Sequence, residues 1–288
     1  MRINIKNNKT YSAEEIRRAN DIASPALDKI WAMQWLSDCI HKKDEAKIET
    51  YNEYVSTLTQ TYEVILVVAG REERASIKAV IDLFDPKEGY PEIVFMPLNF
   101  SISDYASVLR RLENKTVALL AVSIMEESLE LRCAYSVAKH FVTSQSNKAK
   151  ISPEICVIYS ERSRTIKEDA FENEYTKIEV SHRTDPSYLA NTDPVIFILK
   201  LMGADVEAYI RGFYDCVSAP EWDTNLPLIA SRMIEFENKG IIVESWQKEY
   251  EEIAKWFARP DIRASHRQIH MPSPSLDNEC LRIRIGGR

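Results

Sequence analysis

The chain has 288 residues, 45% hydrophobic and 28% charged, which is enough to bury the core of one large or two small domains. Its 37 Lys and Arg against 44 Asp and Glu give a formal charge of −7, which argues against a broad nucleic-acid-binding face. The sequence has no apolar run of about 18 residues and no charged-then-apolar N-terminal segment. We therefore expect a cytoplasmic, soluble protein with neither nucleic acid nor membrane as a partner.

The first 60 residues predict helices. Ser12 to Glu15 form a capping-box pattern, and apolar residues follow at helical spacing as far as Trp31. We expect an N-terminal helical arm over residues 1–60.

From residue 61 to residue 145, strand and helix patterns alternate. Val64 to Val68 form a continuous β-branched and apolar run, which is typical of a strand buried on both faces. The other patterns of this part are strands over 93–95 and 117–122 and helices over 72–84, 103–112 and 126–141. Such alternation predicts βαβ units, in which helices cover both faces of a parallel sheet.

The polar segment 144–153 lacks periodicity and predicts a linker. A second, smaller α/β domain is expected over residues 153–288. Its patterns are strands over 155–159, 176–180 and 281–285 and helices over 194–202, 206–216, 225–237 and 245–257. The predicted fold class is α/β, with two three-layer αβα domains built on parallel sheets.

In doubly wound α/β folds, ligands bind where strands end and helices begin. After the first buried strand come Gly70 and Arg71, followed by Glu72 and Glu73, where an anion-binding loop would have bare amides. An ordinary turn with acids at a helix N-terminus explains these residues as well. In the next turn, Ser101 and Ser103 are candidate helix N-caps.

The turn after the third buried strand runs from Ser123 to Ser128. Two hydroxyls flank Glu126 and Glu127 there. A phosphate would meet the two acids as like charges, so the turn predicts at best a weakened anion site.

No metal or cofactor site is predicted. His266 and His270 are four residues apart, but Pro272 and Pro274 disfavour a helix and no third ligand is evident. The sequence also lacks a G-x-S-x-G nucleophile motif.

The order of these segments resembles the glucose-6-phosphate isomerase family, whose members have two sugar isomerase (SIS) domains of flavodoxin-like fold. Val64 to Gly70 stand where that family has a buried strand and a Gly-Ile-Gly-Gly-Ser turn. Ser123 to Glu130 stand where it has its phosphate loop, Ser-Lys-Ser-Gly-Thr-Thr-Thr-Glu, and only the first and last residues agree. Asn225 to Pro227 and Ile253 to Phe257 continue the resemblance in the same order.

This resemblance implies a homodimer that interconverts glucose 6-phosphate and fructose 6-phosphate without a cofactor. It places a sugar phosphate, the implied small-molecule partner, against the turns after the first and third strands. The substrate-binding residues would be Gly70, Arg71, Ser123, Glu126, Glu127 and Ser128.

The departures from the family fall on its chemistry. The family's arginine in Gly-Gly-Arg has no counterpart unless Arg183 replaces it, and the proton-transferring glutamate is absent after Phe257. His266 is the other weak catalytic candidate, and the family's C-terminal region with its last catalytic lysine has no counterpart. Isomerisation needs a base at the carbon-bound proton and a group that polarises the ring, and neither is identified. Weak or absent isomerase activity is expected; the alternative is a non-catalytic sugar-phosphate-binding or regulatory SIS-domain protein.

Overall fold

The structure is a computed structural model that describes residues 12–14, 17, 18, 21, 25, 45–149, 152–181, 184–218, 241–245, 248–257, 265, 266 and 281–285. The chain divides into two compact units. One comprises residues 42–77 and 84–211, and the other comprises residues 1–41, 78–83 and 212–288.

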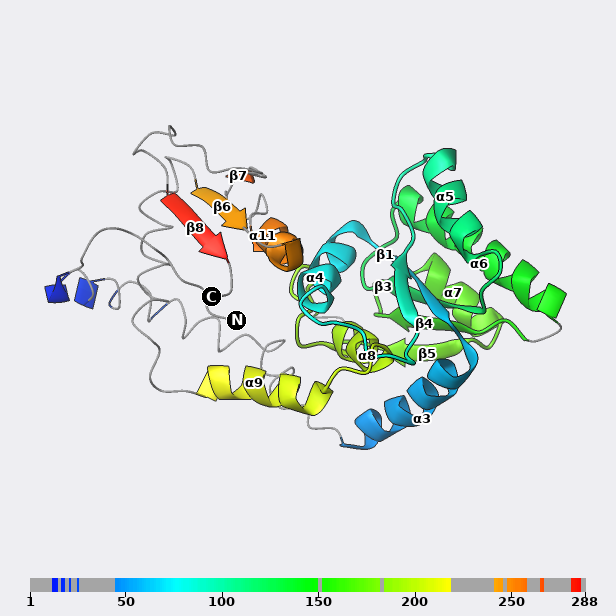
Figure 1. Cartoon of the computed structure of the whole chain (residues 1–288), viewed down its shortest axis with the longest axis horizontal. Coiled ribbons are helices and arrows are strands. Elements are labelled where there is room, and N and C mark those ends of the chain that lie inside the picture. The colour runs from blue at the N-terminus through cyan, green and yellow to red at the C-terminus, as the bar shows by residue number, and fades with distance from the viewer. Residues whose placement is uncertain are drawn as a thin grey trace. The chain divides into compact units, whose positions relative to one another are not determined.

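The larger unit is built on a five-stranded sheet with the order β2-β1-β3-β4-β5, in which every pair of neighbours is parallel (Figure 1). The strands are β1 (Val64–Ala69), β2 (Glu92–Phe95), β3 (Val117–Ser123), β4 (Ile155–Tyr159) and β5 (Thr176–Glu179). All five were predicted from the sequence. This order is that of a doubly wound sheet, and the chain reverses its direction of travel between β1 and β3.

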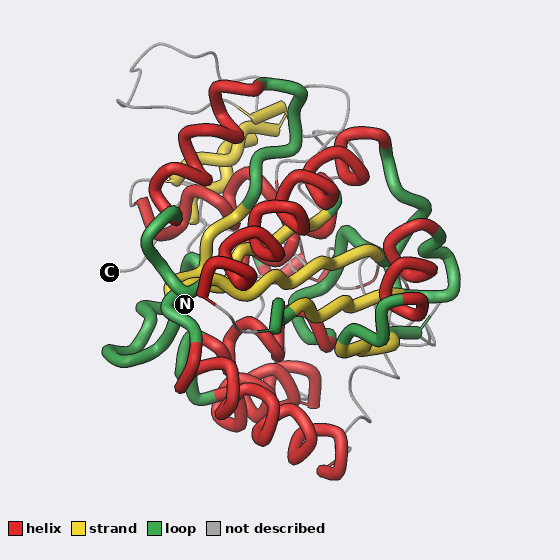
Figure 2. The backbone as a smooth tube through the Cα atoms, turned by 90° about the vertical axis from the view of Figure 1, so that its right-hand side faces the viewer, coloured by secondary structure: helices red, strands yellow, loops and turns green. Residues whose placement is uncertain are grey.

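Helices cover both faces of this sheet, as Figures 1 and 2 show. One layer contains α5 (Ile102–Leu112), α6 (Leu129–Ala149) and α7 (Thr165–Glu172), whose apolar side chains share a core with alternate residues of the strands. The other layer contains α3 (Glu45–Thr61), α4 (Arg71–Ile81) and α8 (Asp193–Leu201). The predicted three-layer αβα arrangement is therefore confirmed.

The pattern of burial explains why these strands could be predicted. Every residue of β1, β3 and β4 is buried, because each of these strands is covered on both faces and paired on both edges. Such strands have uniformly apolar sequences. On the second face, Tyr54 of α3 stacks on Phe197 of α8, with ring centroids 5.9 Å apart.

The predicted division between domains 61–145 and 153–288 is wrong. Helix α6 continues to Ala149, through most of the supposed linker, and β4 and β5 join the same sheet as β1 to β3. Residues 144–149 are polar because part of the last turns of α6 is exposed, and an exposed helix end has the same composition as a linker.

Helices α8 and α9 (Val206–Ser218) confirm the predictions for 194–202 and 206–216. Helix α3 confirms the helical pattern predicted near residue 60, but it contacts α8 and belongs to the larger unit and not to a separate arm. The predicted helix 225–237 lies outside the described residues. Helix α7 was not predicted.

The second unit contains a parallel three-stranded sheet with the order β7-β6-β8. Its strands are β6 (Ile241–Ser245), β7 (Ser265–His266) and β8 (Leu281–Ile285), and only β8 was predicted. The helix expected over 245–257 is shorter: a single 3-10 turn (Lys248–Tyr250) leads into α11 (Glu251–Phe257), which contacts β6. Among the described residues, no helix has both the length and the apolar character that crossing a membrane requires.

Candidate functional site

The candidate site lies at the carboxyl ends of β1 and β3, where the direction of the strand order reverses. Parallel pairing in register, Ala69 opposite Val122, brings the turn at Gly70 and Arg71 next to the turn from Ser123 to Ser128. The two turns that the sequence predicted as a binding site are thus neighbours. Ligands of doubly wound sheets bind at this position.

Glu73 occupies the space between the two turns. It is the third residue of α4, and its side chain is 5% exposed. The Glu73 carboxylate lies so close to Gly70 that a Cβ atom at position 70 would overlap with it. Its Oε1 atom accepts a hydrogen bond from the amide of Ile124 at 3.4 Å. The absence of a side chain at Gly70 therefore makes room for a carboxylate.

The electrostatic surroundings of Glu73 oppose its negative charge. Burial raises the pKa of the Glu73 carboxyl, and the neighbouring charge of Glu72 raises it further. Backbone amides, including those of Ile124 and Met125, act in the opposite direction. Among the described residues, no Lys or Arg forms an ion pair with Glu73.

Glu127, a predicted substrate-binding residue, is turned away from Glu73 toward α7. Its carboxylate accepts the Ser123 hydroxyl at 3.0 Å and the amides of Arg164, Thr165 and Ile166 at 2.9 to 3.2 Å. These amides are the donors that the first turn of a helix leaves without partners, and a carboxylate is favoured there. Glu127 therefore caps α7.

Serines from the turn after β4 hold the loop from the same side. Ser160 Oγ donates to the carbonyl of Ile124 at 2.5 Å, and Ser163 Oγ donates to the carbonyl of Ser123. Ser123, Ser160 and Ser163 are all buried. The sequence analysis missed Ser160 and Ser163, although they follow a buried parallel strand and the same rule would have singled them out.

The remaining predicted binding residues are more exposed. Ser128 caps α6, because its hydroxyl accepts the amide of Leu131 at 3.2 Å, and the side chains of Glu126 and Arg71 reach solvent. The pKa of Glu130 is lowered by its own amide, by the Ser128 hydroxyl and by the charge of Arg71. Arg71 therefore lies near the start of α6, on the β1 side of the loop.

A second arginine lies on the β4 side. Arg162 Nη1 is 3.2 Å from the sulfur of Met125. Met125 and Leu129, in and just after the loop, are 38% and 57% exposed. Two cations and two apolar side chains thus surround the loop after β3.

The two weak catalytic candidates are not brought to this site by any described contact. Arg183 lies outside the described residues, and His266 is in β7 of the other unit. Within the described part of the chain, no three His, Cys, Asp or Glu side chains are grouped as metal ligands.

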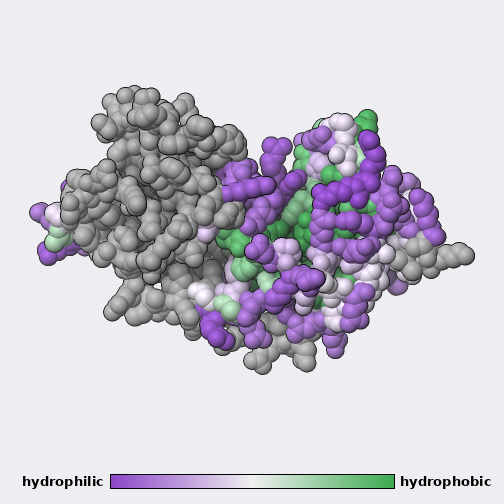
Figure 3. Space-filling model, viewed as in Figure 1, coloured by the Kyte–Doolittle hydropathy of each residue, from purple (hydrophilic) through white to green (hydrophobic). Residues whose placement is uncertain are grey.

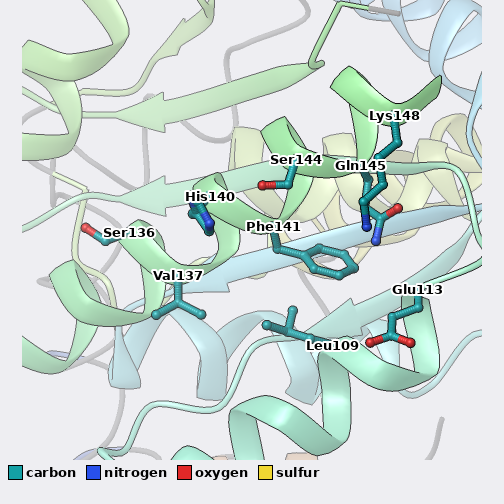
Figure 4. Close-up of a pocket in the computed structure, with 9 residues that line it drawn as sticks. All are labelled: Leu109, Glu113, Ser136, Val137, His140, Phe141, Ser144, Gln145 and Lys148. Atoms are coloured by element: carbon teal, nitrogen blue, oxygen red, sulfur yellow. The ribbon is translucent and has the colours of Figure 1, made fainter. Parts of the chain in front are cut away.

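A separate hollow of about 490 Å³ lies between α5 and α6 (Figure 4). Its lining includes Leu109, Val137, His140, Phe141 and Lys148. Helices of βαβ units run antiparallel to their strands, so these late residues of α5 and α6 lie toward the amino ends of the strands. The hollow is therefore remote from the candidate site.

Apolar residues are also exposed at the start of α5. Most of the described surface in Figure 3 is hydrophilic, and apolar residues reach the surface near α5. Phe100 is 60% exposed and Ile102 is 84% exposed at the start of that helix.

No family model and no curated protein matches this chain. Solved structures do. A hypothetical protein from Thermus thermophilus aligns over 85% of this chain and 60% of its own, with 14% identity and a TM-score of 0.69. A glucose-6-phosphate isomerase from Chlamydia trachomatis aligns over 74% and 42%, with 16% identity and a TM-score of 0.55.

A tagatose-6-phosphate ketose/aldose isomerase from Escherichia coli aligns over 98% of this chain and 75% of its own, with 15% identity and a TM-score of 0.56. The larger unit has the fold of a sugar isomerase (SIS) domain. At these identities the similarity establishes the fold alone. The chain spans less than two thirds of the length of the first two structures.

Proposed function

We propose that this chain binds a phosphorylated sugar at the carboxyl ends of β1 and β3, and that it isomerises the sugar slowly or not at all. The observation that carries the proposal is the buried carboxylate of Glu73, which lies over Gly70 and accepts the amide of Ile124 in the loop after β3. A loop that holds a carboxylate in this way presents donors suited to an anion. Two of the SIS-fold structures are isomerases of 6-phosphorylated sugars, which favours a sugar phosphate as that anion.

The groups around the loop suit the two parts of such a ligand. Arg71 and Arg162 supply positive charge on either side, and phosphate oxygens accept charge-assisted hydrogen bonds from arginine. The exposed parts of Met125 and Leu129 offer an apolar surface to the carbon face of a sugar ring.

The acids of the site are poorly suited to moving a proton on the sugar. Glu127 is committed to four donors, and Glu126 is exposed at the surface. A general base has to reach the carbon-bound proton within hydrogen-bond distance, directly or through one water. This is the reason to expect binding without efficient turnover.

A second candidate function rests on Glu73 itself. A buried carboxyl with a raised pKa at a ligand-binding edge is a candidate general base. In that case the chain would be an aldose-ketose isomerase acting on glucose 6-phosphate, as the resemblance to glucose-6-phosphate isomerases implies.

The first experiment tests binding. Thermal unfolding of the full chain is recorded with glucose 6-phosphate, fructose 6-phosphate and tagatose 6-phosphate, and with glucose as the control that lacks the phosphate. A ligand that binds only the native state raises the melting temperature as its concentration rises. We expect a rise with at least one sugar phosphate and none with glucose, and a smaller rise in Arg162→Ala. A panel without any shift contradicts the proposal.

The second experiment separates the two candidate functions. Conversion of glucose 6-phosphate is followed in a coupled assay for the wild type and for Glu73→Gln, which removes the ionisable group. Absence of turnover in both supports a binding protein. Turnover that is lost in Glu73→Gln establishes the isomerase instead.

A further inference from the structure

The two buried carboxylates at the candidate site are held with different strength. Glu127 accepts four hydrogen bonds, the longest of 3.2 Å, from the Ser123 hydroxyl and from three backbone amides at the start of α7. The hydrogen bond that Glu73 accepts from the amide of Ile124, in the loop after β3, is 3.4 Å long. Hydrogen bonds of this length are weak. Of the two acids, Glu73 is therefore the one that can leave its position at the lower cost.

Burial and charge repulsion also favour displacement of the Glu73 carboxylate from its position. Within the described part of the chain Glu73 has no ion-pair partner, so its buried carboxylate carries a desolvation penalty, and the nearby charge of Glu72 adds repulsion. The side chain has three rotatable bonds, and Glu72 beside it already points to solvent. Rotation of Glu73 would free the amide of Ile124 and the space above Gly70.

We propose that the Glu73 carboxylate is a built-in competitor of the ligand, which occupies the loop amides while the site is empty and has to be displaced when a phosphate group binds. This inference rests on the proposed function, because it concerns the same site. It predicts that the wild-type chain binds sugar phosphate weakly, because the ligand must first expel an anion from the amides it needs.

The negative charge of the competitor can be removed without changing the shape of the site. Glu73→Gln retains the size of the side chain and loses the negative charge, whereas Glu73→Ala vacates the position altogether. Glu72→Gln is the matched control, since it makes the same change in net charge one residue earlier on the exposed side of α4. A general effect of charge on phosphate binding would appear equally in the control.

The dissociation constant of glucose 6-phosphate is measured by calorimetric titration for the full-length wild type, Glu73→Gln, Glu73→Ala and Glu72→Gln. Urea unfolding curves verify that each variant is folded. We expect Glu73→Gln or Glu73→Ala to bind about tenfold more tightly than the wild type, and Glu72→Gln to change affinity by less than about threefold.

The outcomes distinguish this inference from the function it rests on. Binding by the wild type that is no weaker than in both Glu73 variants overturns the competitor and leaves the sugar-phosphate site in place. A gain of equal size in Glu72→Gln also overturns it, because the effect would then be one of net charge. Absence of binding in the wild type and in both Glu73 variants overturns the proposed function together with the inference.

Discussion

At the scale of single residues, the sequence predicted which turns form the candidate site but not what their side chains do. Glu126 and Glu127 are adjacent in the sequence, yet one is exposed and the other caps α7. The amides that donate to Glu127 lie 37 to 39 residues further along the chain. A local sequence pattern cannot reveal a contact between residues so far apart in the sequence. The role of Gly70 could not be predicted either, because it depends on the position of the Glu73 carboxylate in the folded chain.

Replacement of Glu127 tests its structural role. Glu127→Ala leaves the amides of Arg164, Thr165 and Ile166 without this acceptor, whereas the Ser123 hydroxyl can still donate to the carbonyl of Met125. The amide of Ile166 is the buried donor of the three, and a buried donor without a partner costs about 1–3 kcal/mol, to which loss of the helix cap adds about 0.5–2 kcal/mol. We therefore expect the free energy of unfolding to fall by about 2–4 kcal/mol. Urea unfolding measures this loss. Glu126→Ala, in the exposed neighbour, is the control and should change the value by less than about 0.5 kcal/mol.

The pH dependence of stability tests the environment of Glu73. Its pKa is raised by burial from the usual value of 4.5, so the folded protein holds this proton more tightly than the unfolded chain. The contribution of Glu73 to stability is therefore greatest below pH 4.5 and is lost as the pH rises through the raised value. We expect the unfolding free energy of the wild type, relative to Glu73→Gln, to fall over this window. A difference that stays constant between about pH 4 and 8 would contradict the assignment.

At the scale of elements, strands were predicted correctly from the sequence where all of their residues are buried. Strands β1, β3 and β4 are buried throughout and have continuous apolar sequences. Helix α7 is short, and only Ile166 and Ala170 of its residues are buried. Two buried apolar residues in a segment of eight are too few to show the periodicity by which a helix is recognised. Its start is fixed by the carboxylate of Glu127, which comes from another part of the chain.

The start of α5 offers a test of an element that local sequence does specify. Ser101 is its N-cap, and its hydroxyl accepts the amide of Asp104 at 3.3 Å, as the sequence predicted. We expect Ser101→Ala to lower the free energy of unfolding by about 1 kcal/mol. Ser107→Ala, at an exposed position inside the same helix, should be neutral or slightly stabilising because alanine favours helices. Equal losses in both variants would argue against the cap.

At the scale of the whole molecule, the main error of the sequence analysis was to place a domain boundary inside one sheet. The polar end of α6 resembles a linker in composition, and only the pairing of β3 with β4 reveals that the sheet continues. Strand pairing in parallel sheets joins segments that are far apart in the sequence. Such pairing is therefore the part of a fold that periodicity describes least well.

Two fragments test the corrected boundary. Residues 42–211 contain all five strands, and we expect this fragment to unfold cooperatively in urea. Residues 42–152 lack β4 and β5, so the fully buried strand β3 would expose one edge and the core face of α6 would lose its neighbours on α7. We expect no cooperative transition for the shorter fragment. A cooperative transition there would restore the boundary predicted from the sequence.

The strand order has a consequence for the way the protein folds. No two neighbouring strands of the larger sheet are joined by a hairpin, and the first residue of β1 pairs with Val117 across the whole of β2 and its flanking helices. Contacts between such distant segments form slowly, because each closes a long loop before it gains stability. During synthesis on a ribosome, β1 would emerge with its apolar faces uncovered, and its edge toward β3 would stay unpaired until β3 is made. The short outer strands, with Glu92 of β2 paired to Lys115, leave little regular edge once the sheet is complete. The chain should therefore be most prone to aggregation during synthesis, before β3 has joined β1, and least so after folding.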